Sequence, residues 1–223
     1  EMTSGASVKV RDLVHRHVGQ EVPIRVAGLE IESGEKVAIT GPSGCGKTTL
    51  LSCIAGILVP SAGEVAVGDT RVDQLGESAR RKFRREQIGL VFQEFELLEH
   101  LDVRENAFLP LWLAGREPST EEQEKFVGRA TRCGISDLLQ RKPRALSQGE
   151  RQRAAVCRAL MTSPTLVLAD EPTGSLDATS GRVVLDLIFE EAEITGATVI
   201  VVTHDTTMLS GFDRIENIGE DPA

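Results

Sequence analysis

The chain has 223 residues, of which 40% are hydrophobic and 26% charged, and this is ordinary for a globular domain that buries a core. Its net charge of -9 argues against nucleic-acid binding, because nucleic-acid phosphates demand a broad basic face. The longest apolar runs, such as 197–202, are strand-sized, so we expect neither a membrane span nor a signal peptide. Cys45, Cys53, Cys133 and Cys157 lack the paired spacing of metal ligands, which favours reduced thiols in a cytoplasmic setting.

The start of the chain is predicted to form strands. Two segments, 8–14 and 23–31, have the pattern of an antiparallel edge. Between them lie His15 and His17, near a strand end and with no cysteine or carboxylate placed to complete a metal site.

A phosphate-binding loop comes next. It lies between a predicted strand, 36–40, and a predicted apolar helix, 49–55, and it fits G-x-x-x-x-G-K-[ST] without a gap. The predicted ATP contacts here are Gly41, Pro42, Ser43, Gly44, Cys45, Gly46, Lys47, Thr48 and Thr49. The glycines let backbone N–H groups point at the β-phosphate, Lys47 bridges the β- and γ-phosphates, and the Thr48 hydroxyl binds Mg²⁺. A turn without chemical meaning is the alternative, which the preceding strand and the Lys-Thr pair disfavour.

The segment after the phosphate loop carries a basic cluster, 80–85, at the start of a predicted helix. A solvated helical face is one interpretation, and contact with anionic lipid or an acidic partner loop is the other. A strand is predicted over 88–92, and Gln93 stands at its end.

The middle of the chain changes character at residue 93. Residues 93–163 lack runs of β-branched residues and are predicted to be helical, whereas 164–218 return to alternating strand and helix. The predicted helices of the middle segment are 103–114, 120–133 and the helix that follows Ser147. We therefore predict a single domain in which 1–92 and 164–223 form the nucleotide-binding core and 93–163 is a helical insert.

A second glycine-bearing helix start occupies 146–150. Ser147, Gln148 and Gly149 lie where a helix that begins near Glu150 presents its positive end, so their hydroxyl and N–H groups can hold phosphate. An ordinary capping box from Ser147 to Glu150 accounts for the same residues. Both interpretations can hold, because capping describes the free subunit.

Two carboxylates end the apolar strand predicted over 165–171. Asp170 would complete a Mg²⁺ shell, and Glu171, on the opposite side of an extended chain, would face the γ-phosphate and polarise water. A solvated acidic turn is the alternative. We expect Asp170 to meet Lys47 because both follow neighbouring parallel strands, and we expect 198–202 to be the last core strand, just before His204.

In this order the motifs resemble the ATP-binding cassette (ABC) family over nearly the whole chain. The matching elements are 41–48, Gln93, 146–150, 166–171, 175–177 and His204. The resemblance implies an α/β fold: a P-loop NTPase core with a mixed, mainly parallel sheet, an antiparallel β subdomain and a helical subdomain.

The resemblance also implies roles that the patterns alone leave undefined. It implies that Gln93 touches Mg²⁺ and links the nucleotide to the helical subdomain, that Asp177 crosses a dimer interface, and that His204 contacts the γ-phosphate. A lone histidine after a strand is more often a surface or capping residue. The 147–149 segment would hold the γ-phosphate of an ATP bound to a second subunit, so that one chain is half of an active site.

The chain departs from the family pattern at three places. Gln148 stands where a glycine is usual, and Glu150 where a glutamine is usual. The family stacks adenine on an aromatic ring about two dozen residues before the phosphate loop, yet this chain has no tyrosine and His17 stands closest to that position. An imidazole has a smaller stacking face, so whether His17 stacks on the base is left open.

The segments 88–113, 150–153 and 166–177 resemble the subgroup of lipoprotein-releasing, macrolide-export and cell-division ATPases. This implies an integral membrane permease-type partner with few spans, and a peripheral position on the cytoplasmic face of the membrane. Phe95, Leu97 and Leu98 are candidates for the groove that receives the partner; core packing of the helical insert is their alternative role.

The resemblance implies an ATPase that uses ATP and Mg²⁺. Two subunits, as a homodimer, close on two ATP molecules, and Glu171 and His204 position water for hydrolysis. A cassette that acts on DNA or ribosomes is the alternative, but the chain has neither a long coiled coil nor a second cassette. A regulatory ATP-binding module is disfavoured by the presence of Glu171 and His204.

Overall fold

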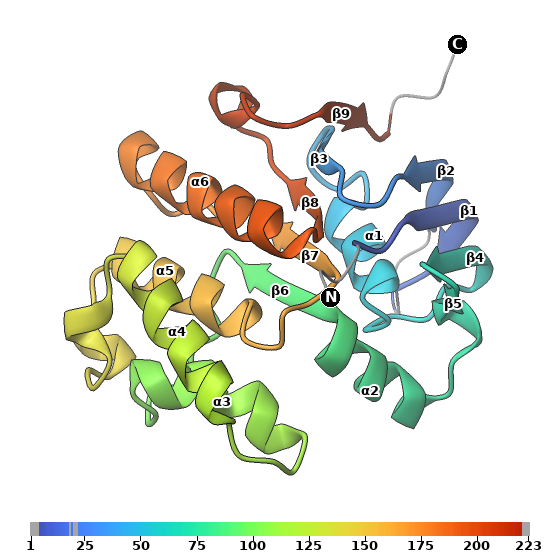
Figure 1. Ribbon diagram of the computed structural model, residues 1–223. Helices are drawn as coiled ribbons and strands as arrows, with labels where there is room; N and C mark the ends of the chain where they lie inside the picture. Colours follow the sequence, from blue (N-terminus) through green and yellow to red (C-terminus); the bar gives the residue numbers. More distant parts are fainter. Residues whose placement is uncertain (1–4, 18, 20–21, 220–223) are drawn as a thin grey trace.

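A parallel sheet forms the centre of the protein in the computed structural model, which describes residues 5–17, 19 and 22–219 (Figure 1). Its strand order is β6-β7-β8-β3-β9, and every neighbouring pair runs parallel. The strands are β3 (Lys36–Thr40), β6 (Ile88–Phe92), β7 (Leu166–Asp170), β8 (Thr198–Val202) and β9 (Arg214–Asn217). The predicted α/β architecture is confirmed.

The position of β8 corrects two predictions. We expected Lys47 and Asp170 to follow neighbouring strands, but β8 lies between β3 and β7, where Val202 pairs with both Ile39 and Asp170. The segment 198–202 is also not the last core strand, because β9 follows it and pairs with β3 at the sheet edge. All five residues of β8 are buried, as a central strand requires, whereas β9 is short, polar and partly exposed, so no apolar pattern revealed it.

An antiparallel sheet lies beside the parallel one, in the order β2-β1-β4-β5, and confirms the predicted antiparallel edge. Its strands are β1 (Val8–His15), β2 (Ile24–Ile31), β4 (Ala62–Val67) and β5 (Thr70–Arg71). One buried apolar cluster joins Val10 of this sheet to Leu50 of the first helix and Ile200 of β8. That shared core holds the phosphate loop between the two sheets.

Helices cover both faces of the parallel sheet. The α-helices are α1 (Lys47–Ile54), α2 (Glu77–Gln87), α3 (Val103–Leu113), α4 (Thr120–Arg132), α5 (Gln148–Ala159) and α6 (Ala178–Thr195). The short 3-10 turns are η1 (Val72–Gln74), η2 (Ser136–Leu138), η3 (Pro143–Ala145) and η4 (Thr206–Met208). Along β8, Ile200 faces the cluster that contains α1, while Val199 and Val201 face the cluster that contains α5 and α6.

Helices α3, α4 and α5 gather at the end of the molecule away from the antiparallel sheet (Figure 1). Residues 93–163, all of which the structure describes, form helices and turns and no strand, as expected for this segment. That 93–163 is an insert in a single nucleotide-binding domain stays a prediction.

Candidate functional site

The phosphate loop is held by close backbone packing. Gly46, the N-cap of α1, has φ 104°, and a Cβ there would lie 2.2 Å from Cγ2 of Ile24. Gly41 has φ 145°, and a Cβ there would lie 2.2 Å from the carbonyl oxygen of Ile218. Only glycine fits these two positions, because they combine left-handed backbone with no room for a side chain.

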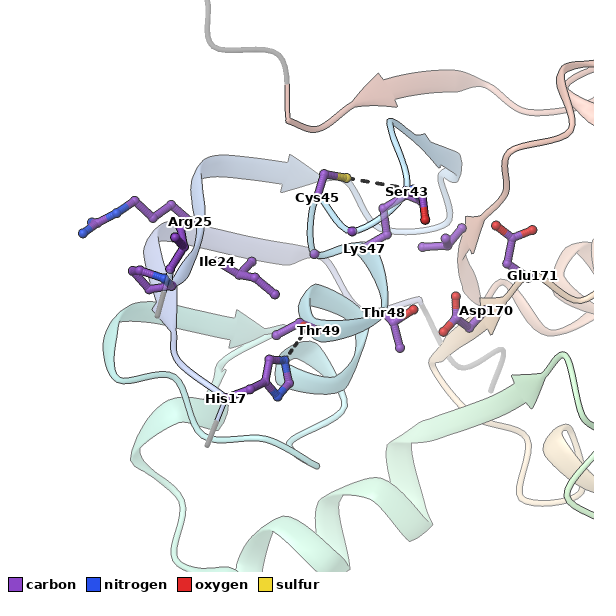
Figure 2. A pocket seen from close by; sticks show the side chains of 15 residues that line it. His17, Ile24, Arg25, Ser43, Cys45, Lys47, Thr48, Thr49, Asp170 and Glu171 are labelled. Carbon is purple, nitrogen blue, oxygen red and sulfur yellow. Dashed lines mark hydrogen bonds between the residues drawn. The ribbon is translucent and has the colours of Figure 1, made fainter. Parts of the chain in front are cut away.

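A cavity of about 560 Å³ opens beside this loop (Figure 2). The predicted residues that line it are His17, Ser43, Gly44, Cys45, Gly46, Lys47, Thr48, Thr49, Asp170 and Glu171. Val22, Pro23, Ile24, Arg25 and Val202 complete the lining. The structure therefore brings the phosphate loop and the carboxylates of β7 to one cavity, although β8 separates their strands.

The side chains of the loop hold one another in place. Lys47 Nζ donates to the carbonyl oxygens of Gly41 at 2.7 Å and Pro42 at 2.9 Å, so its ammonium is kept at the mouth of the loop. Half-buried Cys45 has its Sγ 3.9 Å from the same nitrogen. One ring nitrogen of His17, Nε2, lies 2.9 Å from the Thr49 hydroxyl oxygen, which places the imidazole at the start of α1.

Asp170 has the surroundings of a metal ligand. Its Oδ1 is buried and has no hydrogen-bond partner in the part of the chain that the structure describes. Burial raises the pKa of the Asp170 carboxyl, while the neighbouring Thr48 hydroxyl and the charge of Lys47 oppose that rise. A buried carboxylate oxygen without a partner beside a hydroxyl is the hard oxygen donor set that Mg²⁺ prefers.

Glu171 stands at a turn and not in an extended strand. β7 ends at Asp170, and Glu171 has φ 49°, in the left-handed region that glutamate rarely adopts. Its N–H donates to the carbonyl oxygen of Val202 at 2.9 Å, which fixes the turn to β8. We predicted that strand alternation would aim this carboxylate, and this was wrong: the strained turn aims it.

His204 lies against Glu171. Its Nδ1 is 2.7 Å from the Glu171 carboxylate, and the imidazole is 70% exposed while the glutamate side chain is 18% exposed. His204 therefore reaches the cavity through Glu171 rather than by lining it.

The second glycine-bearing segment lies outside the cavity. Ser147 caps α5: its hydroxyl accepts from the N–H of Glu150 at 3.3 Å, and the Glu150 carboxylate accepts from the N–H of Ser147 at 2.7 Å. The predicted capping box is thus present. Neither Gln148 nor Gly149 is among the described residues that line the cavity.

Asp177 shares a surface with that segment. It caps α6, accepting from the backbone N–H of Ser180 at 3.0 Å and from its hydroxyl at 2.7 Å. A Cβ on Gly149 would lie 3.8 Å from the same Ser180 hydroxyl. The N-termini of α5 and α6 therefore lie beside one another, and neither Ser147 nor Asp177 is among the described residues that line the cavity with Lys47.

Gln93 follows β6 and is exposed, outside the described lining of the cavity. It lies beside the turn after β7, because a Cβ on Gly174 would be 3.1 Å from its Nε2.

Gln152, near Gln93, was not singled out from the sequence. Its buried Nε2 donates to the carbonyl oxygens of Phe92 at 3.2 Å and Pro172 at 2.7 Å, and so ties α5 to the ends of β6 and β7. The sequence signal that could have identified Gln152 is a glutamine among the apolar residues on the buried face of α5.

This loop, this parallel sheet and these paired carboxylates define a P-loop ATPase of the cassette type. The family described as ABC transporter matches residues 24–174, and the chain belongs to it. It is accordingly an ATP-binding and ATP-hydrolysing subunit of a family whose cassettes dimerise and work with membrane permease subunits.

Relatives and solved structures agree with this assignment. The lipoprotein-releasing system ATP-binding protein LolD of Pseudomonas fluorescens is 39% identical over 98% of this chain and 97% of its own. The ABC transporter ATP-binding protein YxdL of Bacillus subtilis is 40% identical over 86% of this chain and 74% of its own. The dimeric bacterial ABC transporter cassette MJ0796 has a TM-score of 0.83 at 34% identity, covering 95% of this chain and 94% of that chain. A search of the described residues for a helix able to cross a membrane found none.

Proposed function

We propose that the cavity beside the phosphate loop binds ATP with Mg²⁺, and that Glu171 activates the water that attacks the γ-phosphate. The observation that carries this proposal is the unpartnered, buried Oδ1 of Asp170 beside Thr48 and Lys47. An unpaired buried carboxylate oxygen costs free energy unless a ligand satisfies it.

Each residue then has one task. Thr48 and Asp170 would hold Mg²⁺, and Gln93, at the end of β6, would join them when the nucleotide binds. When bound, the ion neutralises charge that develops on the phosphate oxygens. Lys47, held by two carbonyl oxygens in the free protein, exchanges these for phosphate oxygens.

Glu171 acts as the base that takes the proton of the attacking water. Its strained turn and the bond to Val202 fix its backbone, and His204 holds the carboxylate at 2.7 Å. Because His204 is mostly exposed, it can rotate to the γ-phosphate once a nucleotide fills the cavity.

The 147–149 segment and Asp177 serve a second subunit. The N-terminus of α5 can hold phosphate once its capping box opens, yet its residues are not among the described lining of the cavity that contains Lys47 of the same chain. A homodimer that sandwiches two ATP molecules brings Ser147 and Gly149 to the γ-phosphate of the partner's nucleotide, and the dimeric form of MJ0796 supports this arrangement.

A groove of about 640 Å³ between α2, β6, α3 and α5 is the proposed docking surface for the membrane partner. The apolar lining residues are Ile88, Leu90, Phe92, Leu109, Pro110, Leu113 and Ala159, and the basic ones are Arg81, Arg84, Arg85 and Arg158. Part of the basic cluster thus edges an apolar groove, which fits a partner helix with an apolar face and acidic ends. Phe95, Leu97 and Leu98 do not line this groove, and Leu97 packs against a buried cluster.

We further propose that the ATPase drives a membrane partner in export, lipoprotein release or envelope remodelling, from the cytoplasmic face. The similarity to LolD over nearly the whole chain supports this class. A non-transport cassette acting on a soluble or nucleic-acid partner is the second candidate, and the net charge of -9 disfavours nucleic acid.

The decisive experiment for the site replaces Glu171 by Gln in the purified protein. Turnover should fall by about 10²–10⁴-fold, while ATP with Mg²⁺ should produce a stable dimer in size-exclusion chromatography with light scattering. Glu94→Gln, an exposed glutamate outside the cavity, is the matched control. Near-normal turnover in the Glu171 variant would refute its role as the base.

The groove is tested through the partner. Leu113, which is 68% exposed and lines the groove, is replaced by Glu, and Val127, 55% exposed on α4, is the control. We expect Leu113→Glu to abolish co-purification of a few-span membrane subunit from detergent extract while the isolated subunit keeps its ATPase activity. Loss of co-purification in the Val127→Glu control as well, or in neither variant, would refute the groove as the docking surface.

A further inference from the structure

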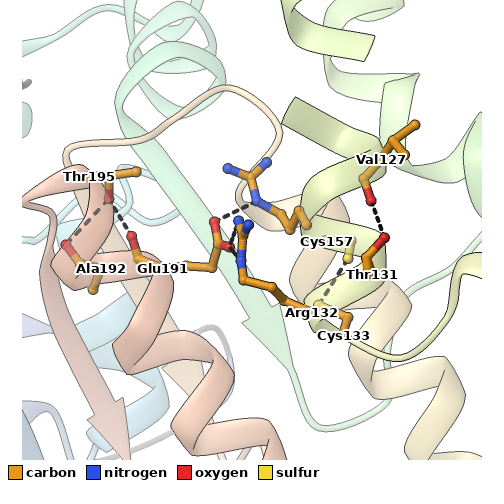
Figure 3. A network of polar contacts seen from close by, with 9 residues as sticks. Val127, Thr131, Arg132, Cys133, Cys157, Glu191, Ala192 and Thr195 are labelled. Carbon is orange, nitrogen blue, oxygen red and sulfur yellow. Dashed lines mark hydrogen bonds and ion pairs between the residues drawn. The ribbon is translucent and has the colours of Figure 1, made fainter. Parts of the chain in front are cut away.

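Two buried thiols face one another where α4 ends against α5 (Figure 3). Cys133 is the C-cap residue of α4, Cys157 lies in α5, and their Sγ atoms are 3.2 Å apart. Their exposed fractions are 2% and 0%, and both are free thiols. A disulfide needs its sulfur atoms about 2.0 Å apart, so an approach of about 1.2 Å would join them.

The charges around this pair favour reaction at Cys133. The S–H of Cys157 donates to the Cys133 sulfur, and this hydrogen bond, with the positive charges of Arg129 and Arg132, lowers the pKa of the Cys133 thiol against the effects of burial and of Glu191. Arg129 and Arg132, both on α4, bind the carboxylate of Glu191 on α6. Figure 3 labels Arg132 and Glu191 of this group. A thiolate is the nucleophilic form of cysteine, so Cys133 is the attacking sulfur.

Cys53 shows what burial alone does. It is 1% exposed, and burial raises the pKa of its thiol to about 11. It therefore serves as an internal reference for a cysteine that is equally buried but whose thiol pKa is raised.

We propose that Cys133 and Cys157 form a redox modification site, at which a hydroperoxide converts the two thiols into an intramolecular disulfide. The Cys133 thiolate attacks a peroxide oxygen, the O–O bond breaks, and the released hydroxide or alkoxide takes a proton. The Cys157 sulfur then displaces hydroxide from the resulting sulfenic acid and forms the S–S bond, and its proton leaves in water. Two electrons pass from the thiols to one peroxide.

The disulfide closes a loop that contains the 147–149 segment. The two cysteines are separated by 24 residues, and the loop between them includes the capping box that begins α5. Joining the end of α4 to α5 stabilises this region, because it removes freedom from the opened chain. The expected effect on turnover rests on the proposed function: a fixed helical segment cannot adjust its phosphate-binding end to a second subunit.

The test treats the purified full chain with hydrogen peroxide and maps its peptides by mass spectrometry without reduction. We expect the peptides that carry Cys133 and Cys157 to be joined and lighter by two hydrogen atoms, with Cys53 still alkylatable after unfolding. The melting temperature should rise by several degrees, and ATP turnover should fall at least about threefold and return on reduction by dithiothreitol.

Variants of three cysteines test the site, and the peptide map separates it from Cys45, the thiol of the phosphate loop. In Cys133→Ala and Cys157→Ala, the joined peptide and the reversible rise in melting temperature must both disappear. The ATP turnover of each variant is compared between its own oxidised and reduced forms. In Cys53→Ala both must persist. Oxygen addition at Cys133, a link through Cys45, or an unlinked pair would overturn the proposal. A link without a change in turnover would overturn only the effect on activity, whereas an inactive reduced protein would count against the proposed function.

Discussion

The phosphate loop and the 147–149 segment are both helix starts for which we propose phosphate binding, yet they keep their shapes by different means. The loop is fixed mainly by close packing, with Gly41 and Gly46 placed where no Cβ fits, although the Lys47 side chain also binds two of its carbonyl oxygens. The segment is fixed by side chains: the capping box of Ser147 and Glu150 on α5. Side-chain hydrogen bonds can break and re-form during a movement, whereas close backbone packing cannot. We infer that the loop is the static half of the site and the segment the mobile half.

The helical segment, 93–163, is attached to the nucleotide-binding core by polar side chains, as the 147–149 segment is held by its capping box. Glu191 of α6, 1% exposed, accepts from Arg129 at 2.7 Å and also binds Arg132. Gln152 of α5 donates to the carbonyl oxygen of Pro172, just beyond β7, at 2.7 Å. These bonds join regions far apart in the sequence through polar side chains rather than through a continuous sheet.

The largest effect should come from breaking that attachment. Glu191→Ala leaves the buried guanidinium of Arg129, whose side chain is 5% exposed, without its partner, which should lower the free energy of unfolding by about 3–5 kcal/mol in urea denaturation. The double variant Arg129→Met, Glu191→Leu should recover most of the loss. A loss below about 1 kcal/mol in the single variant would show that the ion pair does not hold the helical segment.

The static half is tested by Lys47→Ala. Removing an ammonium that binds two phosphate groups should weaken ATP binding by about 100-fold, as measured by calorimetry. Lys125→Ala is the control, since Lys125 is exposed and pairs with Glu121 on the surface of α4. Undiminished ATP affinity in Lys47→Ala would show that Lys47 of the loop does not bind ATP.

The mobile half is tested by Ser147→Ala. ATP binding by the monomer should stay within about twofold, while dimer-dependent turnover should fall about tenfold and helix capping should lose about 1 kcal/mol. Ser147→Thr keeps a hydroxyl for both tasks and should retain most activity. If Ser147→Ala weakened monomer binding as much as turnover, the segment would belong to the cavity of its own chain.

The smallest effect should come from His17, the candidate for stacking on the adenine ring of ATP. His17→Ala removes a ring that lines the cavity beside Thr49, and we expect ATP affinity to fall about threefold by calorimetry. His17→Phe should reverse the change, because a larger ring stacks better. Equal affinities in all three proteins would exclude a stacking role for His17.

Much of the phosphate site was predictable because its chemistry is contiguous in the chain. A loop from Gly41 to Thr48 needs only a strand before it and a helix after it, and both are present. The capping box at Ser147 is equally local. The strand order was not predictable, because β8 must be placed between β3 and β7 by packing on both faces. The turn at Glu171 was missed for a related reason, since β8 holds its N–H.

The sequence by itself predicted which residues bind phosphate and Mg²⁺, and it determined that the chain is an α/β cassette, since both depend on short motifs and local periodicity. Only the tertiary structure decided which residues meet. It brought Asp170 to Thr48 across an intervening strand, joined Arg129 to Glu191 over 62 residues, and placed Cys133 against Cys157. Such contacts depend on how helices pack against the sheet, and no local pattern encodes that geometry.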